Sequence, residues 1–276
     1  GGRGYGWIGR YFDAECDGEP QPDLCVAMGD QAPLATQGRS FQPISFQDER
    51  LFRWSGADLD DRIARSYDRI NRAGVLDDVD DQSPAGFIMR TALDAQVSSD
   101  RIRAAMRAQP LVSYPGNALG ESLKQIGLMI RAGLPTRVYY ASLGGFDTHA
   151  GQPYRHAQLL GQYAEAAAAF QRDIRQQGNA SRVVTATFSE FGRRVKQNAS
   201  QGTDHGTAAP MFVMGEPIRG GLHGRHPSLT QLDTGGDLVH TTDFRSVYAT
   251  LLKHWLTADP VPVLGRSYPT LRLIRT

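Results

Sequence analysis

The second half of the chain alternates strand-like and helix-like segments, and this alternation constrains the fold more than any other feature. Apolar runs predict strands over residues 137–143, 182–188 and 211–214, and apolar periodicity predicts helices over 154–177 and 242–255. Strands that alternate with helices are typical of an α/β domain with a largely parallel sheet. Because such sheets bind ligands beyond the carboxyl ends of their strands, functional residues are expected just after each strand.

The first half of the chain predicts less regular structure. Residues 1–55 are rich in Gly, Pro and Gln, which favours an irregular segment with short strand-like pieces. Helical periodicity follows at 59–74, 84–108 and 117–132. Since no internal repeat or linker divides the 276 residues, we expect a single domain over 1–276, made of an irregular N-terminal segment (1–55), a helical insert (56–133) and an α/β core (134–276).

Charge and cysteine content narrow the classes of function. The chain has 30 Lys and Arg residues against 29 Asp and Glu residues, so it has no basic field for nucleic acid or for a membrane surface. Its apolar runs are too short for a membrane-spanning helix. The two cysteines, Cys16 and Cys25, lie in a polar loop, and their spacing suits a small disulfide in an oxidising compartment and two free thiols equally well.

Carboxylates and imidazoles follow the predicted strands. Asp147 and His149 come after the first strand, Glu190 after the second, and Asp204 and His205 in a later polar loop. Each piece alone also fits a solvated loop, a helix cap or a surface ion pair. Together they are ligands that suit Zn²⁺ or Mn²⁺, and residues two apart in an extended loop point the same way. The five residues therefore predict a divalent metal site, with enough ligands for much of a two-metal centre.

The candidate ligands lie in three short motifs, Gly-Phe-Asp-Thr-His at 145–149, Ser-Glu-Phe-Gly-Arg at 189–193 and Gly-Thr-Asp-His-Gly at 202–206. These motifs resemble signatures of the DUF1501 family. The segments 6–11 and 242–245 are also similar, so the resemblance covers nearly the whole chain. The family is grouped with the alkaline phosphatase/sulfatase superfamily and is often exported through twin-arginine signals in bacteria. The resemblance thus implies a three-layer α/β/α sandwich, alkaline-phosphatase-like, in a periplasmic or otherwise exported protein.

The resemblance also implies roles for individual residues. Asp147 and His149 resemble the pair that binds one metal ion, and His205 resembles a His later in the sequence that binds the same ion. Glu190 stands where the superfamily has an Asp ligand of the other metal, and Phe191 stands where a His ligand is expected. A second alignment makes Asp204 and His205 the Asp-His pair itself. Both alignments bring Glu190, Asp204 and His205 into one neighbourhood, and the implied cofactor is Zn²⁺ or Mn²⁺, with Mg²⁺ or Ca²⁺ as alternatives.

The N-terminus departs from the family pattern. Family members carry an early strand with a Gly-Gly-x-Asp-Gly motif, and the superfamily places a metal-ligand Asp and a Ser or Thr nucleophile there; neither is recognisable at residues 1–4. We therefore expect the later two-thirds of a family member, with the N-terminal part missing or supplied by a separate N-terminal fragment as a partner. The implied function is metal-dependent hydrolysis of a small anionic phosphate or sulfate ester. Guanidinium chemistry lets Arg193 or Arg194 clamp the tetrahedral anion, and we predict Arg193 as the catalytic residue. The alternative is a non-catalytic exported binding or assembly protein on a degenerate scaffold.

Overall fold

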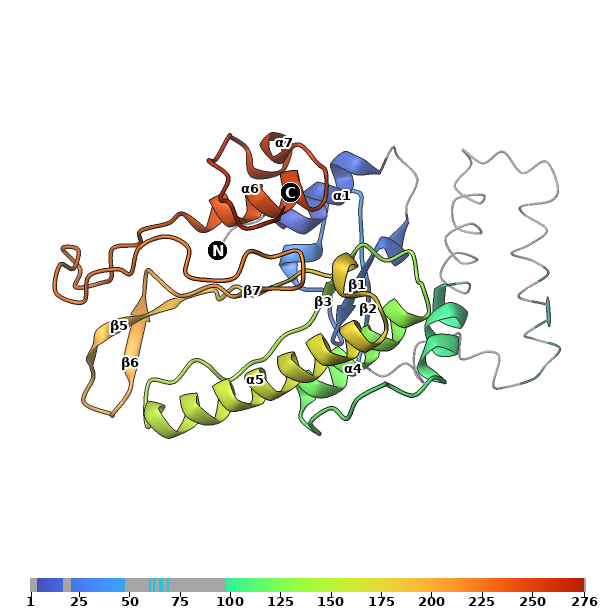
Figure 1. The fold of residues 1–276 in the computed structure, drawn as a ribbon, viewed down its shortest axis with the longest axis horizontal. Coiled ribbons are helices and arrows are strands. Elements are labelled where there is room, and N and C mark those ends of the chain that lie inside the picture. Colours follow the sequence, from blue (N-terminus) through green and yellow to red (C-terminus); the bar gives the residue numbers. More distant parts are fainter. Residues whose placement is uncertain are drawn as a thin grey trace. The chain divides into compact units, whose positions relative to one another are not determined.

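The computed structural model describes residues 4–16, 21–47 and 98–275, together with residues 60, 62, 65, 66 and 69. Of the predicted helix at 59–74 the structure describes only these five residues, and 62, 65, 66 and 69 are helical. Most of the predicted helix at 84–108 lies outside the described residues, although residues 98–106 are helical. The chain divides into two compact units, one formed by Gly1–Gln109 with Leu128–Ala141 and the other by Pro110–Gly127 with Ser142–Thr276. The structure is a mixed α/β fold with a small parallel sheet, which confirms the predicted class at that level (Figure 1).

The first unit is built around a three-stranded parallel sheet. Its strands are β1 (Cys25–Met28), β2 (Ile44–Phe46) and β3 (Val138–Tyr140), in the order β2-β1-β3. All four residues of β1 are buried, as expected for a central parallel strand that is covered on both faces. The unit also contains helix α1 (Trp7–Glu15) and the 3₁₀ turns η1 (Pro22–Leu24) and η2 (Leu34–Thr36). The segment predicted to be irregular thus supplies the central strand, because its short apolar run is buried by long-range pairing.

Helix α1 is fixed by aromatic packing and by one carboxylate. Tyr11 and Phe12 are fully buried, and the ring of Phe12 stacks on that of Phe41 at 4.3 Å between centroids. Asp13 accepts hydrogen bonds from the backbone N–H groups of Arg39, Ser40 and Phe41 at 2.6, 2.9 and 2.9 Å. This side chain thereby ties the loop before β2 to the helix.

The second unit holds the remaining helices and two small antiparallel sheets. Helices α5 (Gln152–Gln176), α6 (Phe244–His254) and α7 (Pro260–Leu264) lie wholly in it, together with the turn η4 (Ala180–Arg182). Helix α4 (Ala118–Arg131) begins in this unit and ends in the first. Strand β4 (Thr185–Ala186) pairs with β7 (Val213–Met214), and β5 (Gly192–Gln197) pairs with β6 (Thr203–Gly206) as a hairpin.

This strand pairing corrects the predicted sheet. The three strands expected at 137–143, 182–188 and 211–214 do not share one parallel sheet, because β3 pairs with β1 whereas β4 and β7 pair with each other in antiparallel fashion. The motif at 202–206 was expected in a loop, but its residues 203–206 form strand β6 of the hairpin. Apolar composition predicted where strands form, but pairing depends on contacts between residues far apart in the sequence.

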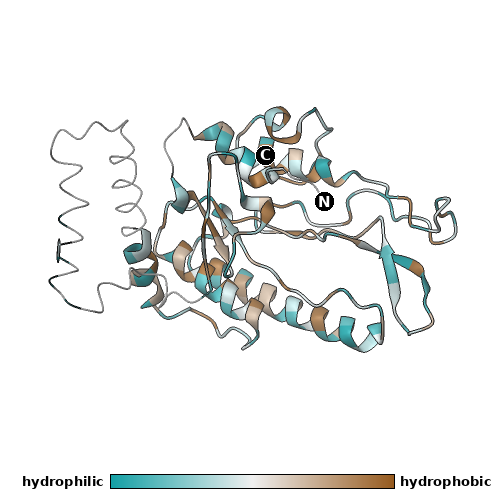
Figure 2. Cartoon of the chain, turned by 180° about the vertical axis from the view of Figure 1, so that it is seen from behind, coloured by the Kyte–Doolittle hydropathy of each residue, from teal (hydrophilic) through white to brown (hydrophobic). Residues whose placement is uncertain are grey.

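Helix α5 is 25 residues long and buries one face from Leu159 onward. Its buried residues include Leu159, Ala166 and Phe170, and hydrophilic and hydrophobic residues alternate along it (Figure 2). Asp173 is fully buried on the same helix, and its carboxylate accepts hydrogen bonds from the Tyr114 hydroxyl at 2.8 Å and the Leu111 backbone N–H at 3.2 Å. The buried carboxylate thus anchors the segment before α4.

Two further expectations concern cysteines and membranes. Cys16 and Cys25 are both free thiols in the structure, and burial raises the pKa of the Cys25 thiol to about 12. Within the part of the chain that the structure describes, every helix is too short or too polar to cross a lipid bilayer.

Candidate metal centre

Two segments of the second unit bring the candidate ligands together. The loop after β3 carries Asp147 and His149, and strand β6 carries His205, which pairs with Arg193 of β5 in the hairpin register. The loop turns sharply at Gly145, whose φ of 96° lies in the left-handed region that favours glycine. The backbone N–H of Gly151, just before α5, donates to the carbonyl of Ser200 at the hairpin turn. These backbone contacts place the loop against the hairpin.

Asp147, His149 and His205 form a compact donor cluster. One ligand atom from each lies within 4.8 Å of the other two. Oδ1 of Asp147 is 2.9 Å from Nε2 of His149 and 2.7 Å from Nε2 of His205, and the two Nε2 atoms are 3.3 Å apart. Two imidazoles and one carboxylate that converge in this way fit a transition-metal cation, and the set matches the three-ligand pattern of catalytic zinc sites.

The three side chains are open to solvent. The exposed fractions are 62% for Asp147, 49% for His149 and 47% for His205. The hydrogen bond from His205 is the largest effect and lowers the pKa of Asp147. Burial opposes it, and the nearby charges of His149 and Arg193 lower the pKa further. The carboxylate is therefore ionised at neutral pH, the state in which it can bind a cation.

Asp204 lies on the other side of His149. Its Oδ1 atom is 3.4 Å from Nδ1 of His149, the ring nitrogen that does not face Asp147. The amide of Asn198 donates to the His149 carbonyl at 2.9 Å and to Oδ1 of Asp204 at 3.5 Å. The Asn198 contact, followed by that of His149, lowers the pKa of Asp204. A carboxylate in this place orients the imidazole and does not itself join the cluster.

Arg193 links the loop to the hairpin. Its side chain is 16% exposed, and its terminal nitrogens donate to the carbonyls of Thr203, at 2.6 Å, and Phe146. One of them also lies 3.6 Å from Oδ1 of Asp147. The Phe191 ring stacks on the His205 ring at 3.9 Å and 5°, and the Arg193 guanidinium lies 4.9 Å from the centre of the same phenyl ring. Arg193 and Phe191 thus hold His205 and the loop in place.

The hairpin turn touches the His149 backbone at a position that only glycine fits. A Cβ atom on Gly202 would lie 2.2 Å from both the carbonyl carbon and the carbonyl oxygen of His149. The side-chain oxygen of Asn198 accepts from the backbone N–H groups of Ser200 and Gly202, both at 3.0 Å, which closes the turn. The close contact between Gly202 and the His149 backbone therefore determines the distance between strand β6 and the loop.

The structure thus sorts the five predicted metal ligands. Asp147, His149 and His205 share one cluster, whereas Asp204 contacts only the far nitrogen of His149 within that group. Glu190 is exposed, and among the described residues it forms no hydrogen bond or ion pair with the cluster. The sequence analysis did not single out Asn198, although the stretch 198–202, with its Asn, Ser and Gly, has the composition of a loop.

The cluster and the mixed α/β fold define a candidate metalloprotein. Comparison with known families assigns the chain to one of them. Residues 3–264 match the DUF1501 family, which is described as a protein of unknown function, so the chain belongs to this family. No curated protein and no solved structure matches the chain.

Proposed function

We propose that the protein is a metal-dependent hydrolase of phosphate or sulfate esters whose cation is held by Asp147, His149 and His205. The observation that carries the proposal is the convergence of these three donors within 4.8 Å from segments more than fifty residues apart. Two nitrogen donors favour Zn²⁺ or Mn²⁺ over Mg²⁺ and Ca²⁺, which prefer oxygen ligands. We further propose that the fold is an elaborated relative of the three-layer alkaline-phosphatase-like sandwich and that the protein is exported, on the strength of the three family motifs.

The residues around the cluster have distinct parts in this proposal. A bound divalent cation would activate water and offset negative charge on the ester. Asp204 accepts from Nδ1 of His149 and so keeps Nε2 of that ring free to bind the cation. Arg193 places a fixed positive charge beside Asp147 and draws an anionic substrate toward the cluster. The terminal nitrogens of Arg193 already donate to two carbonyls. We therefore assign Arg193 an electrostatic and positioning role rather than a direct hydrogen-bonded contact with the anion.

Metal content and ester hydrolysis test the proposal together. Purified protein is expected to retain about one Zn²⁺ or Mn²⁺ per chain by plasma mass spectrometry, as one three-ligand cluster can hold one ion. It should also hydrolyse an aryl phosphate or an aryl sulfate, with loss of activity on chelation. The variants Asp147→Ala and His205→Ala should lose both metal and activity. His223→Ala is the matched control, because that exposed imidazole contacts only the backbone carbonyl of Arg219 within the described chain. Wild-type protein without a stoichiometric metal would refute the site.

One observation favours a second function. The three ligand side chains are about half exposed, whereas hydrolytic sites commonly exclude bulk water around the reacting groups. This exposure fits the alternative of a non-catalytic exported binding or assembly protein that keeps a cation site. Metal bound at one ion per chain without hydrolysis of either ester would support this alternative and exclude the hydrolase.

A further inference from the structure

One side-chain contact joins helix α5 to strand β6 outside the cation cluster. The hydroxyl of Thr203, the first residue of β6, donates to Oε1 of Gln152, the first residue of α5, at 3.0 Å. Both residues are half-buried, whereas the three ligands of the cluster are exposed. In the described part of the chain, neither side chain forms a hydrogen bond with a ligand of the cluster, so the pair needs an explanation of its own.

The contact lies on the face of β6 that carries His205. Successive residues of a strand point to opposite faces, so the side chains of Thr203 and His205 share one face. His205 reaches Asp147 at 2.7 Å between Nε2 and Oδ1, and Thr203 reaches Gln152 five residues further along the chain from Asp147. This face of β6 is therefore tied to the segment 147–152 at two points, and only one of them is a contact between ligands.

The side chain of Gln152 is held in the orientation that this contact needs. Its Nε2 atom lies 3.5 Å from Nε2 of His156, one helical turn later, and its Oε1 atom is directed at Thr203. The His156 ring meets the Phe146 ring edge-on, at 5.6 Å between centroids. The backbone N–H of Gln152, which has no partner within α5, donates to the Gln201 carbonyl at 3.0 Å. Gln152 thus binds the hairpin through its backbone and its side chain together.

We propose that Gln152 is a positioning residue of the cation cluster, which keeps His205 beside Asp147 by fixing Thr203 on the same face of β6. This inference rests on the proposed function, because it concerns the cation site of that proposal. The Arg193 guanidinium already fixes the Thr203 backbone by donating to its carbonyl at 2.6 Å. The Gln152 contact adds the second point that stops the strand from turning about its axis. Without it, the imidazole two residues later moves away from the carboxylate.

Metal binding by the full chain tests the contact. Gln152→Ala and Thr203→Val each remove the hydrogen bond, and each should weaken Zn²⁺ binding about tenfold in competition with a chelator, at the lower end of the range for groups that orient ligands. The double variant should bind Zn²⁺ no more weakly than the weaker single variant, because both substitutions remove the same bond. Thr203→Ser keeps the hydroxyl and should restore the wild-type affinity.

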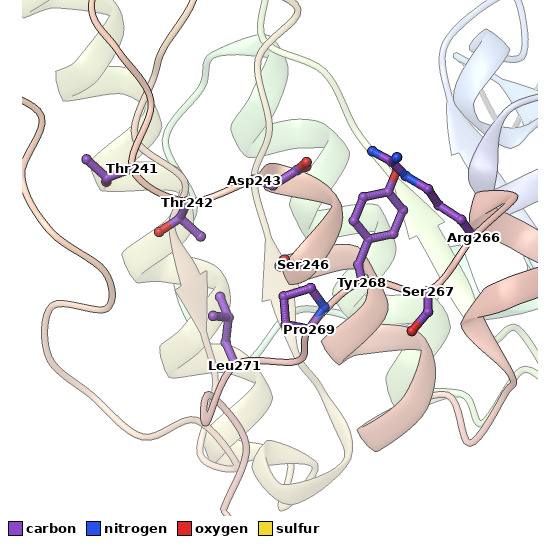
Figure 3. A pocket seen from close by; sticks show the side chains of 9 residues that line it. All are labelled: Thr241, Thr242, Asp243, Ser246, Arg266, Ser267, Tyr268, Pro269 and Leu271. Atoms are coloured by element: carbon purple, nitrogen blue, oxygen red, sulfur yellow. The ribbon is translucent and has the colours of Figure 1, made fainter.

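Two controls match these substitutions. Gln158→Ala changes an exposed glutamine of α5 whose side chain has no hydrogen bond in the described part of the chain. Thr242→Val removes a half-buried hydroxyl at the hollow of about 430 Å³ beside the start of α6, whose lining includes neither a cluster ligand nor Gln152 (Figure 3). Both variants should bind Zn²⁺ like the wild type. Thermal melting checks that each variant is folded.

A metal-free measurement separates positioning from stability. The His205 ring stacks on the Phe191 ring at 3.9 Å and 5°, so its carbon-bound protons lie over the phenyl face and resonate upfield in NMR spectra of EDTA-treated protein. Gln152→Ala should move these signals toward those of an unstacked histidine. A residue with a purely structural role would lower the melting temperature and leave the signals of the folded state in place.

The two proposals fail in different ways. Unmoved His205 signals in folded Gln152→Ala, or Zn²⁺ binding by Thr203→Ser as weak as that of Thr203→Val, would overturn the positioning role and leave the hydrolase proposal standing. Wild-type protein that binds no metal would refute the proposed function instead, and the His205 signals of the metal-free protein would still decide whether Gln152 positions that ring.

Discussion

Replacing Gly202 by alanine tests whether the hairpin turn sets the geometry of the candidate metal centre. The added Cβ would lie 2.2 Å from the His149 carbonyl group, which is 0.8 Å inside the 3.0 Å limit that real Cβ atoms keep, and the conflicting atoms are backbone. Either the turn or the His149 backbone must move by nearly that amount. Such overpacking costs roughly 1–3 kcal/mol of unfolding free energy.

The same displacement reaches the metal ligands. The contacts between His149 and His205, at 3.3 Å between Nε2 atoms, join the two segments that the new methyl group pushes apart. Disturbing the groups that orient metal ligands commonly lowers metal affinity about 10–100-fold. We therefore expect Gly202→Ala to weaken Zn²⁺ binding by about that factor in a competition assay with a coloured chelator.

A glycine in open space provides the control. Gly161 lies on the exposed side of α5 with nothing within 4 Å of an added Cβ, so Gly161→Ala should raise the unfolding free energy by about 1 kcal/mol through helix propensity. Urea unfolding measures both variants. If Gly202→Ala does not fold, Asn198→Ala loosens the same turn without a steric conflict and should also weaken metal binding. Wild-type metal affinity and stability in Gly202→Ala would show that the turn and His149 do not approach each other as described.

Three further predictions concern single side chains. Asp204→Ala should lower Zn²⁺ affinity about 10–100-fold and change the tautomer of His149 seen in ¹⁵N NMR, whereas an unchanged tautomer would exclude the positioning role. Tyr114→Phe removes one donor to the buried Asp173 carboxylate and should cost about 1–3 kcal/mol in urea unfolding, and no loss would refute the anchor. Asp13→Ala should destabilise the protein at neutral pH and progressively less in acid. Burial opposes the shift, but three backbone N–H groups lower the pKa of Asp13 below its ordinary 3.8. Its stabilisation is complete above that value and disappears as the pH falls through the lowered pKa, so a stability difference that persists in strong acid would contradict this account.

The sequence alone predicted the donors that the structure brings together in the candidate site. Asp147 and His149 are two residues apart in an extended loop, and this local spacing predicted that both would face one cation. His205 was predicted as a further donor from its later polar loop, and the family resemblance assigned it to the same cation as Asp147 and His149. These inferences depend on residue type and short-range geometry, which are both readable from a single sequence.

Apolar composition located most of the ordered segments as well. The helices at 117–132, 154–177 and 242–255 correspond to α4, α5 and α6. Strand β1 was visible as a short apolar run inside a segment that otherwise predicted irregular structure, and its burial on both faces comes from pairing with β2 and β3.

Only the tertiary structure decided which donors share a site. Asp204 and His205 are adjacent in sequence, and a loop would allow both to reach one cation. On strand β6 successive residues point to different sides, so they approach different nitrogens of His149. The hairpin register and the contact of Gly202 with the His149 backbone fix that arrangement. The register is set within the hairpin itself, but the contact of Gly202 with His149 joins segments about fifty residues apart that meet only in the folded chain, so no local signal encodes it.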